Sequence, residues 1–213
     1  MTEAELWWQT AMILLMFSIG MVTPGPSKIR LIHVALSGER RAALGLAIGL
    51  GLGSFLWCAA AFVGLASLVA VNPSLSTAIT LFAIVYLSWL ATSAFRSAYY
   101  SIDPRAASDA EMQPLKSSIR NGLLLHLTNP KTALAWVAIS AIAISPTTPL
   151  WYVLALTLLL GALSLTGHAI YAIAFSTRRA ASVYADAKRS LELLFGLVYS
   201  GVAAWLAIDL AGL

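Results

Sequence analysis

Residues 6–27 read LWWQTAMILLMFSIGMVTPGPS, and this stretch decides the class of fold. Its apolar part, 6–22, approaches the roughly 20 residues that carry a helix across a hydrocarbon core. It ends in Thr-Pro-Gly-Pro-Ser, which cannot lie in a continuous helix. Pro24 and Pro26 lack N–H groups, and each disfavours helical geometry in the residue before it. The stretch therefore predicts a membrane helix that is broken just after residue 22.

The rest of the chain has the same apolar character. Of its 213 residues, 60% are hydrophobic and only 10% are charged, whereas soluble domains carry roughly a quarter charged residues. Strands of a membrane barrel would alternate with a period of two, and the apolar runs do not. We therefore expect an all-α integral membrane protein. The runs predict six transmembrane helices, at about 6–26, 43–70, 75–98, 119–144, 149–175 and 191–211.

Lysine and arginine residues are unevenly distributed among the connections. All but one of the 13 fall in the first, third and fifth connections, and connections 71–74 and 145–149 carry none. The positive-inside rule places basic connections in the cytoplasm. We therefore expect a multi-pass protein of the bacterial cytoplasmic (inner) membrane with both termini outside. The exception is Lys131, which lies within a predicted span.

The one sizeable polar stretch, 99–118, divides the chain into two halves, 1–98 and 119–213. We interpret it as a cytoplasmic linker within a single transmembrane domain. Each half holds three predicted spans, and an odd number of spans reverses the orientation of the next half. The sequence therefore predicts two inverted three-helix repeats.

A second break is predicted at the corresponding place in the second half, where the chain reads Thr-Asn-Pro-Lys at 128–131. Asn129 is a good N-cap, and Pro130 suits the first position of a helix. We expect the first and fourth helices to be broken, with new helices starting near Ser27 and Pro130. Paired interruptions in inverted halves are the best sequence indication of a transporter's substrate site.

The chemistry of these breaks favours an anionic group. Freed N–H groups at Ser27 and Lys131, together with the helix dipoles, would attract a carboxylate. Lys131 adds a full charge, and charges within membrane spans are costly and usually functional. Thr23, Ser54 and Asn129 offer further polar contacts. We therefore predict a substrate site that includes Pro24, Gly25, Pro26 and Pro130 as the residues that form the breaks.

Gly45, Gly49 and Gly53 recur at every fourth position of the second span. Small residues on one helix face allow close packing of a neighbouring helix. We interpret this face as a packing surface, and it is compatible with a homodimer.

Three ionisable residues in or beside the later spans give weaker indications of a functional role. His126 precedes the second break, where it could relay protons, although a packing role is the interpretation we favour. Glu192 and Asp209 lie at the two ends of the last predicted span. Carboxylates at the ends of spans usually face water, so we expect both to do so.

Several functions have no support in the sequence. It contains no nucleophile–base pair, phosphate-cradling glycine loop or metal-ligand spacing, so we expect no enzyme, cofactor or metal. It has no Walker motif for ATP hydrolysis. Transport would therefore be driven by an ion gradient or would be simple facilitated diffusion. Basic residues confined to alternate short loops also argue against a nucleic-acid partner.

Two stretches, TPGPSKIRLIHVALSGERRAALGLAIGLGLGS and GLLLHLTNPKTALAW, resemble the two signatures of the lysine exporter (LysE/RhtB-like) amino-acid efflux family. The resemblance covers essentially the whole chain. It implies export of amino acids and related small metabolites, coupled to the proton-motive force. The residues that match motif positions are Thr23, Pro24, Gly25, Pro26, Asn129, Pro130 and Lys131.

Two positions depart from the family pattern. Ser27 stands where the family usually has Asn, and Ser54 stands where it often has an acidic residue. If that acid meets a substrate ammonium or a proton, the substrate here differs from the usual basic or hydroxylated amino acids.

These observations together predict a secondary-active exporter of amino acids or related small zwitterionic metabolites, working by alternating access. Its partners would be the small-molecule substrate and the lipid bilayer. The alternative is a channel-like or scaffold membrane subunit without active transport.

Overall fold

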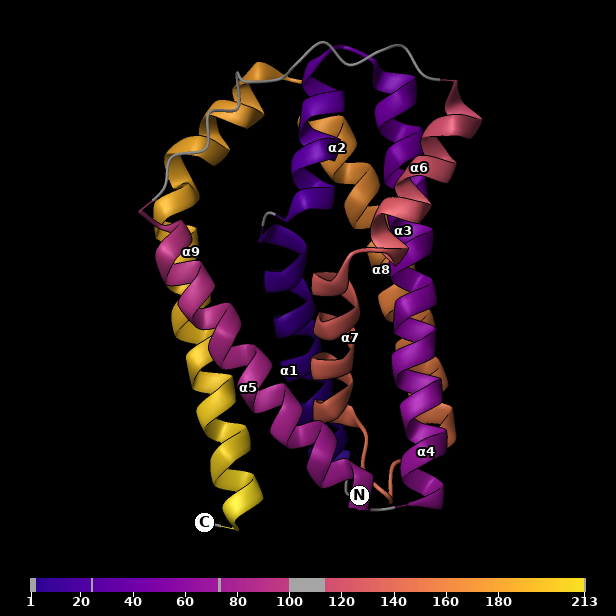
Figure 1. Cartoon of the computed structure of the whole chain (residues 1–213), viewed down its shortest axis with the longest axis vertical. Coiled ribbons are helices and arrows are strands. Elements are labelled where there is room, and N and C mark those ends of the chain that lie inside the picture. The colour runs from indigo at the N-terminus through magenta and orange to yellow at the C-terminus, as the bar shows by residue number, and fades with distance from the viewer. Residues whose placement is uncertain (1–2, 24, 73, 100–113, 213) are drawn as a thin grey trace.

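The structure, a computed structural model, describes residues 3–23, 25–72, 74–99 and 114–212. This part of the chain is helical and contains no strand, which confirms the predicted all-α class. The helices run roughly along the long axis of the molecule (Figure 1). Five stretches are long and apolar enough to cross a membrane: Glu5–Val22, Arg40–Val71, Ser74–Ser97, Leu150–Ala174 and Ser182–Ala211.

Each half of the chain begins with two helices separated by a break. The first half forms α1 (Glu3–Val22), α2 (Pro26–Leu36), α3 (Arg40–Ala59), a π-helical turn (Ala60–Gly64), α4 (Leu65–Val71) and α5 (Ser74–Ser97). The second half forms α6 (Leu115–Leu127), α7 (Pro130–Ala143), α8 (Leu150–Ala174) and α9 (Arg178–Ala211).

The fourth predicted span differs most from a simple membrane helix. It consists of α6 and α7, of which only α7 is a markedly apolar helix, and α7 has just 14 residues. Helix α6 begins at Leu115, within the predicted linker, and most of that linker lies outside the described residues. The described chain thus has five long apolar helices and one shorter one.

Small residues bring α3 and α6 into close contact. A Cβ atom on Gly49 would lie 2.1 Å from a backbone oxygen of α6, and one on Gly122 would lie 2.3 Å from a backbone oxygen of α3. Gly45 and Gly53 also face α6 at distances that leave no room for a side chain. The predicted packing role of this glycine face is confirmed.

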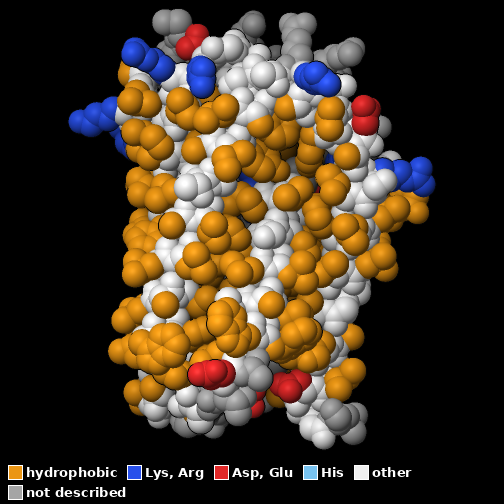
Figure 2. Space-filling model, turned by 180° about the vertical axis from the view of Figure 1, so that it is seen from behind, with side chains coloured by type: hydrophobic (Ala, Val, Ile, Leu, Met, Phe, Trp, Pro, Cys, Tyr) orange, Lys and Arg blue, Asp and Glu red, His pale blue; other side chains and the backbone are white. Residues whose placement is uncertain are grey.

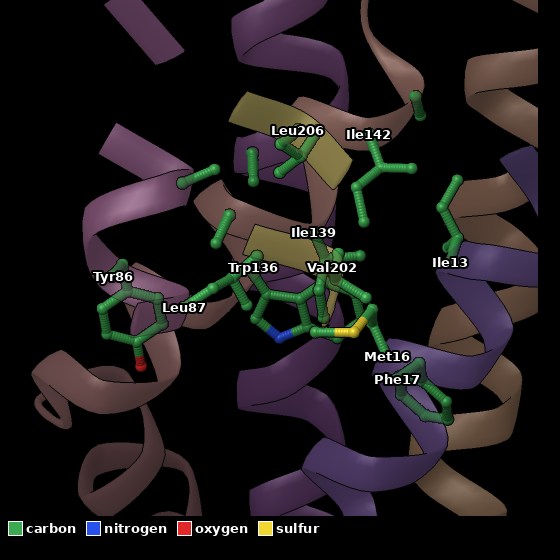
Figure 3. Packing of buried hydrophobic residues seen from close by; sticks show 14 of the residues in the cluster. Ile13, Met16, Phe17, Tyr86, Leu87, Trp136, Ile139, Ile142, Val202 and Leu206 are labelled. Atoms are coloured by element: carbon green, nitrogen blue, oxygen red, sulfur yellow. The ribbon is translucent and has the colours of Figure 1, made fainter. Parts of the chain in front are cut away.

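The main buried cluster is centred on α7. Figure 3 shows Trp136 in the middle, with Met16 and Phe17 of α1 on one side and Tyr86 and Leu87 of α5 on the other. The ring centroids of Trp136 and Phe17 are 5.8 Å apart. The short helix after the second break is therefore held inside the molecule by large side chains, and these fix the position of its N-terminus.

The outer surface is apolar over a wide middle band. Figure 2 shows hydrophobic side chains covering that band, with lysine and arginine side chains gathered above it. Val85 and Leu197 are 70% and 65% exposed. Such exposure is unfavourable in water but suits hydrocarbon chains. Both ends of the chain lie at the end of the molecule opposite that basic region (Figure 1).

The close approach of α3 and α6 predicts that Gly49→Ala destabilises the protein. The added methyl group has no space, and overpacking of this kind costs about 1–3 kcal/mol. The melting temperature of the detergent-solubilised protein should fall. Gly201→Ala on α9 is the matched control, because a Cβ there meets nothing within 4 Å. An unchanged melting temperature for Gly49→Ala would contradict the packing described here.

Candidate functional site

The first break separates α1 from α2, as the sequence predicts. Helix α1 ends at Val22, and α2 begins at Pro26 with Gly25 as its N-cap residue in extended geometry. Among the described residues, no side chain caps the N-terminus of α2. Its first N–H groups therefore keep the partial positive charge that attracts anions. Pro24 lies outside the described residues, as does the side chain of Pro26.

The second break is closed by its own N-cap. Pro130 is the first residue of α7, and the Asn129 Oδ1 atom accepts a hydrogen bond from the Lys131 N–H at 3.0 Å. Both residues have the roles that the sequence predicts. The contact also corrects one expectation, because the N–H of Lys131 is already occupied and is not free for a substrate. What α7 offers at this point is the side chain of Lys131.

The two breaks face each other in space (Figure 1). The Asn129 Nδ2 atom donates a hydrogen bond to the Ser27 Oγ atom at 3.0 Å. The aliphatic part of Lys131 reaches across as well, since its Cδ atom lies 3.8 Å from the Cβ position of Gly25. Two motifs from opposite halves of the sequence thus form one polar centre.

A cavity of about 100 Å³ lies beside this centre. That volume exceeds the space of several water molecules and suits a small solute. Among the described helices, every one except α4 contributes to its wall. The residues singled out from the sequence that line it are Thr23, Gly25, Ser27, Ser54, His126, Asn129 and Lys131. Pro130 begins α7 but does not line the cavity.

Lys28 departs from the sequence-based view. By its place in the sequence it belongs with the basic residues of the first connection, but its side chain is buried and lines the cavity. Its ammonium group donates hydrogen bonds to the carbonyl oxygens of Gly20 and Thr23. These carbonyls lie at the end of α1, where a helix runs out of N–H partners. Lys28 and Lys131 therefore give the cavity two basic side chains.

Two other side chains bond to further backbone carbonyls at the breaks. The Tyr171 hydroxyl donates to the Val22 carbonyl oxygen at 3.0 Å. The Trp57 indole N–H donates to the Leu127 carbonyl oxygen at 3.3 Å. Because lipid supplies no hydrogen-bond partners, breaks at membrane depth depend on contacts of this kind.

Two hydroxyl groups predicted as polar contacts form part of the cavity wall. The Ser54 Oγ atom accepts a hydrogen bond from the Trp136 Nε1 atom at 3.2 Å. The Thr23 Oγ1 atom donates to the Ile19 carbonyl oxygen at 2.8 Å and lies 3.4 Å from the Tyr199 hydroxyl oxygen. Both hydroxyls are held in fixed positions by the helices around them.

Comparison with known proteins agrees with this architecture. The profile of LysE type translocators matches residues 18–210. The chain belongs to the LysE type translocator family. It is 28% identical to a leucine efflux protein of Klebsiella pneumoniae over 88% of this chain and 89% of the relative. A threonine efflux protein of Salmonella typhi is 30% identical over 56% of this chain and 62% of its own length. No solved structure gives a significant match.

One carboxylate of this translocator is not where the sequence analysis expects it. Glu192 is only 2% exposed, and its Oε1 atom accepts a hydrogen bond from the Ser97 hydroxyl at 3.1 Å. The expectation that it faces water is wrong, because α9 begins at Arg178 and places Glu192 well inside a long helix packed on α5. Asp209 at the other end is exposed, as expected.

Sequence reasoning missed several residues of the translocator's cavity: Lys28, Tyr86, Trp136, His168 and Tyr199. His168 carried the clearest overlooked signal, because an imidazole in the middle of an apolar span is costly unless it has a role. Tyr86 and Tyr199 gave no signal of this kind. Aromatic residues are common in membrane helices, and only the packing shows which of them face the cavity.

The contact between Asn129 and Ser27 predicts energetic coupling between the two breaks. Asn129→Ala should cost about 1–2 kcal/mol, because it removes both the cap and the bridge. Ser27→Ala removes only the bridge. The loss of unfolding free energy in the double variant should be smaller than the sum of the losses in the two single variants. The difference should be about 0.5–1.5 kcal/mol, measured by thermal unfolding. Ser200→Ala, on the exposed face of α9, is the control and should be additive with Asn129→Ala. Additivity of the Ser27 and Asn129 changes would contradict the bridge.

Proposed function

We propose that this LysE type translocator is a secondary-active exporter of amino acids or related small zwitterionic metabolites across the bacterial cytoplasmic membrane. The observation that carries the proposal is the cavity between two facing helix breaks, with Lys28 and Lys131 in its wall. Irregular backbone at membrane depth is tolerated where it lines a cavity or is buried in protein. Buried cations beside it favour a substrate with a negatively charged group.

The substrate carboxylate binds between the two breaks. The uncapped N-terminus of α2 presents N–H groups near Ser27, and Lys131 reaches the same place from α7. Lys28 already donates to two backbone carbonyls, so Lys131 is the cation better placed to bind the carboxylate. Thr23, Ser54 and Asn129 supply hydroxyl and amide groups at the rim of this subsite.

The rest of the substrate is small and largely apolar. Phe17, Met21, Leu90 and Ile139 line the cavity together with the polar centre. These apolar residues offer no partner for a charged side chain on the substrate. An aliphatic amino acid such as leucine fits this lining best, which agrees with the similarity to the leucine efflux protein of Klebsiella pneumoniae.

Transport follows an alternating-access cycle in which two inverted three-helix repeats, 1–98 and 119–213, move against each other. In this scheme the pair α1 and α2 corresponds to the pair α6 and α7. Helices α6 and α7 together form the fourth span, which brings the total to six. Both chain ends lie at the same end of the molecule, which supports an even number of crossings (Figure 1). The proton-motive force drives the cycle, as the family resemblance implies.

The proposed orientation places both termini outside and the basic end in the cytoplasm. Reporter fusions test it. A periplasm-active reporter at the C-terminus should be active, whereas a reporter that fluoresces only in the cytoplasm should stay dark. The opposite pattern would reject the orientation.

Lys131→Ala should reduce export about tenfold or more with normal membrane abundance, because it removes a charge-assisted contact to the carboxylate. The measurement is efflux of labelled leucine from loaded cells or vesicles. Lys116→Ala is the matched control, since Lys116 is exposed on α6 and does not line the cavity. Pro130→Ala, which alters the start of α7, should also reduce export about tenfold. Full transport by the Lys131 and Pro130 variants would reject the assigned site.

Purified protein in vesicles loaded with a mixed amino-acid pool identifies the substrate and tests the alternative. An exporter shows saturable loss of selected amino acids that responds to a proton gradient. A channel shows flux without saturation, and a scaffold subunit shows none. Either of the last two results would reject the proposed function.

A further inference from the structure

Two histidines from different helices meet in the wall of the cavity. His126 of α6 and His168 of α8 have ring centroids 5.4 Å apart and interplanar angles near perpendicular, at 87°. Their side chains are 5% and 2% exposed, and both line the cavity. His126 is held from behind by α3, where a Cβ on Gly53 would lie 2.8 Å from the His126 Cβ atom.

One ring has a defined tautomer. The His168 Nδ1 atom lies 2.8 Å from the Ser164 carbonyl oxygen, which can only accept, so Nδ1 carries the hydrogen. In the neutral ring the Nε2 atom then bears a lone pair. This Nε2 atom and the His126 Nδ1 atom are buried without a hydrogen-bond partner in the described part of the chain. Buried polar atoms are normally paired, and the exceptions call for an explanation.

The described groups around this histidine pair provide no carboxylate partner for the ammonium group of a zwitterion. The titratable groups that share the cavity are Lys28 from α2, Tyr86 from α5, Lys131 from α7 and Tyr199 from α9. The face of α3 against His126 supplies glycine and Ser54, and none of the described lining residues is a carboxylate. The lysine side chains favour the carboxylate of the substrate. An ammonium group needs acceptors, and the unpaired buried nitrogens beside the wall are His168 Nε2 and His126 Nδ1, the latter an acceptor when the hydrogen of that ring is on Nε2.

We propose that His126 and His168 bind the ammonium group of the substrate and, in alternation with it, the transported proton. This inference rests on the proposed function and deepens it. The ammonium donates N–H hydrogen bonds to the imidazole lone pairs and keeps its own protons. When a proton from water bonds to one of these nitrogens instead, the acceptor is lost and a like charge appears.

Proton and ammonium therefore exclude each other at the same atoms. Mutual exclusion at one site is what exchange requires, because the carrier crosses with one ligand and returns with the other. The pair thus takes the place that an acidic side chain would fill, next to Ser54 on α3. A positioning or packing role would require neither free lone pairs nor a site on the cavity wall.

The wild-type protein itself provides the first test, with leucine and 4-methylpentanoate, which lacks the ammonium group. Binding of each is measured on purified protein from about pH 8 to about pH 6, where both carboxylates remain largely ionised. Leucine affinity should fall as the pH falls, by up to about tenfold per pH unit in the titration range. Affinity for 4-methylpentanoate should hold or rise, because the imidazolium attracts its carboxylate. Parallel pH dependence of the two ligands would overturn the proposal.

Paired substitutions separate ammonium binding from proton binding. In the double variant His126→Gln with His168→Gln, the amide oxygens accept hydrogen bonds but take up no proton. Leucine exchange between vesicle compartments should persist within about threefold, while accumulation driven by a pH gradient should fall at least tenfold. In His126→Leu with His168→Leu, the preference for leucine over 4-methylpentanoate should also fall at least tenfold.

His33→Gln is the matched control, because His33 does not line the cavity, and it should keep both exchange and accumulation. Melting temperatures identify any variant that fails to fold, and the ligand comparison on wild-type protein then decides alone. Gradient-driven accumulation by the folded glutamine variant would overturn this inference and leave the exporter intact. Wild-type vesicles that move no amino acid would overturn both proposals.

Discussion

A broken helix inside a membrane needs hydrogen-bond partners that lipid cannot supply, and the rest of this structure depends on meeting that need. The ammonium of Lys28 and the hydroxyl of Tyr171 donate hydrogen bonds to carbonyl oxygens at the end of α1. The Trp57 indole N–H donates to a carbonyl oxygen at the end of α6. Asn129 caps α7 and also bonds to Ser27. These contacts come from several helices, so the breaks are stable only in the assembled molecule.

The same contacts leave the two breaks unequal, and that difference has chemical consequences. Helix α7 is capped by Asn129, whereas α2 has no side-chain cap. In the proposed function, the substrate carboxylate is therefore directed to the N-terminus of α2, with Lys131 completing the subsite from the opposite half. The imidazoles of His126 and His168 lie on the same cavity wall and give it acceptors. One small space thus presents donors for an anion and acceptors for a cation.

Much of the fold could be predicted from the sequence because it follows from local rules. Two prolines around Gly25 must interrupt a helix, and an Asn-Pro pair must start one. The long apolar runs must lie in lipid. The burial of Glu192 could not be predicted in this way, because it depends on how far α9 extends and on its packing against α5. The burial of Lys28 could not be predicted for a similar reason, since a basic side chain at the edge of a span can turn inward and bond to a nearby helix end.

The sequence by itself determined an all-helical membrane protein, the places where two helices break, and the residue types at each break. Only the tertiary structure decided that the breaks face each other, that Lys28 is drawn into the cavity, and that His126 meets His168. The physical reason is the range of the forces involved. Proline sterics and helix capping act over a few residues, whereas the cavity is created by helices distant in sequence that pack as closely as Gly49 and its neighbours allow.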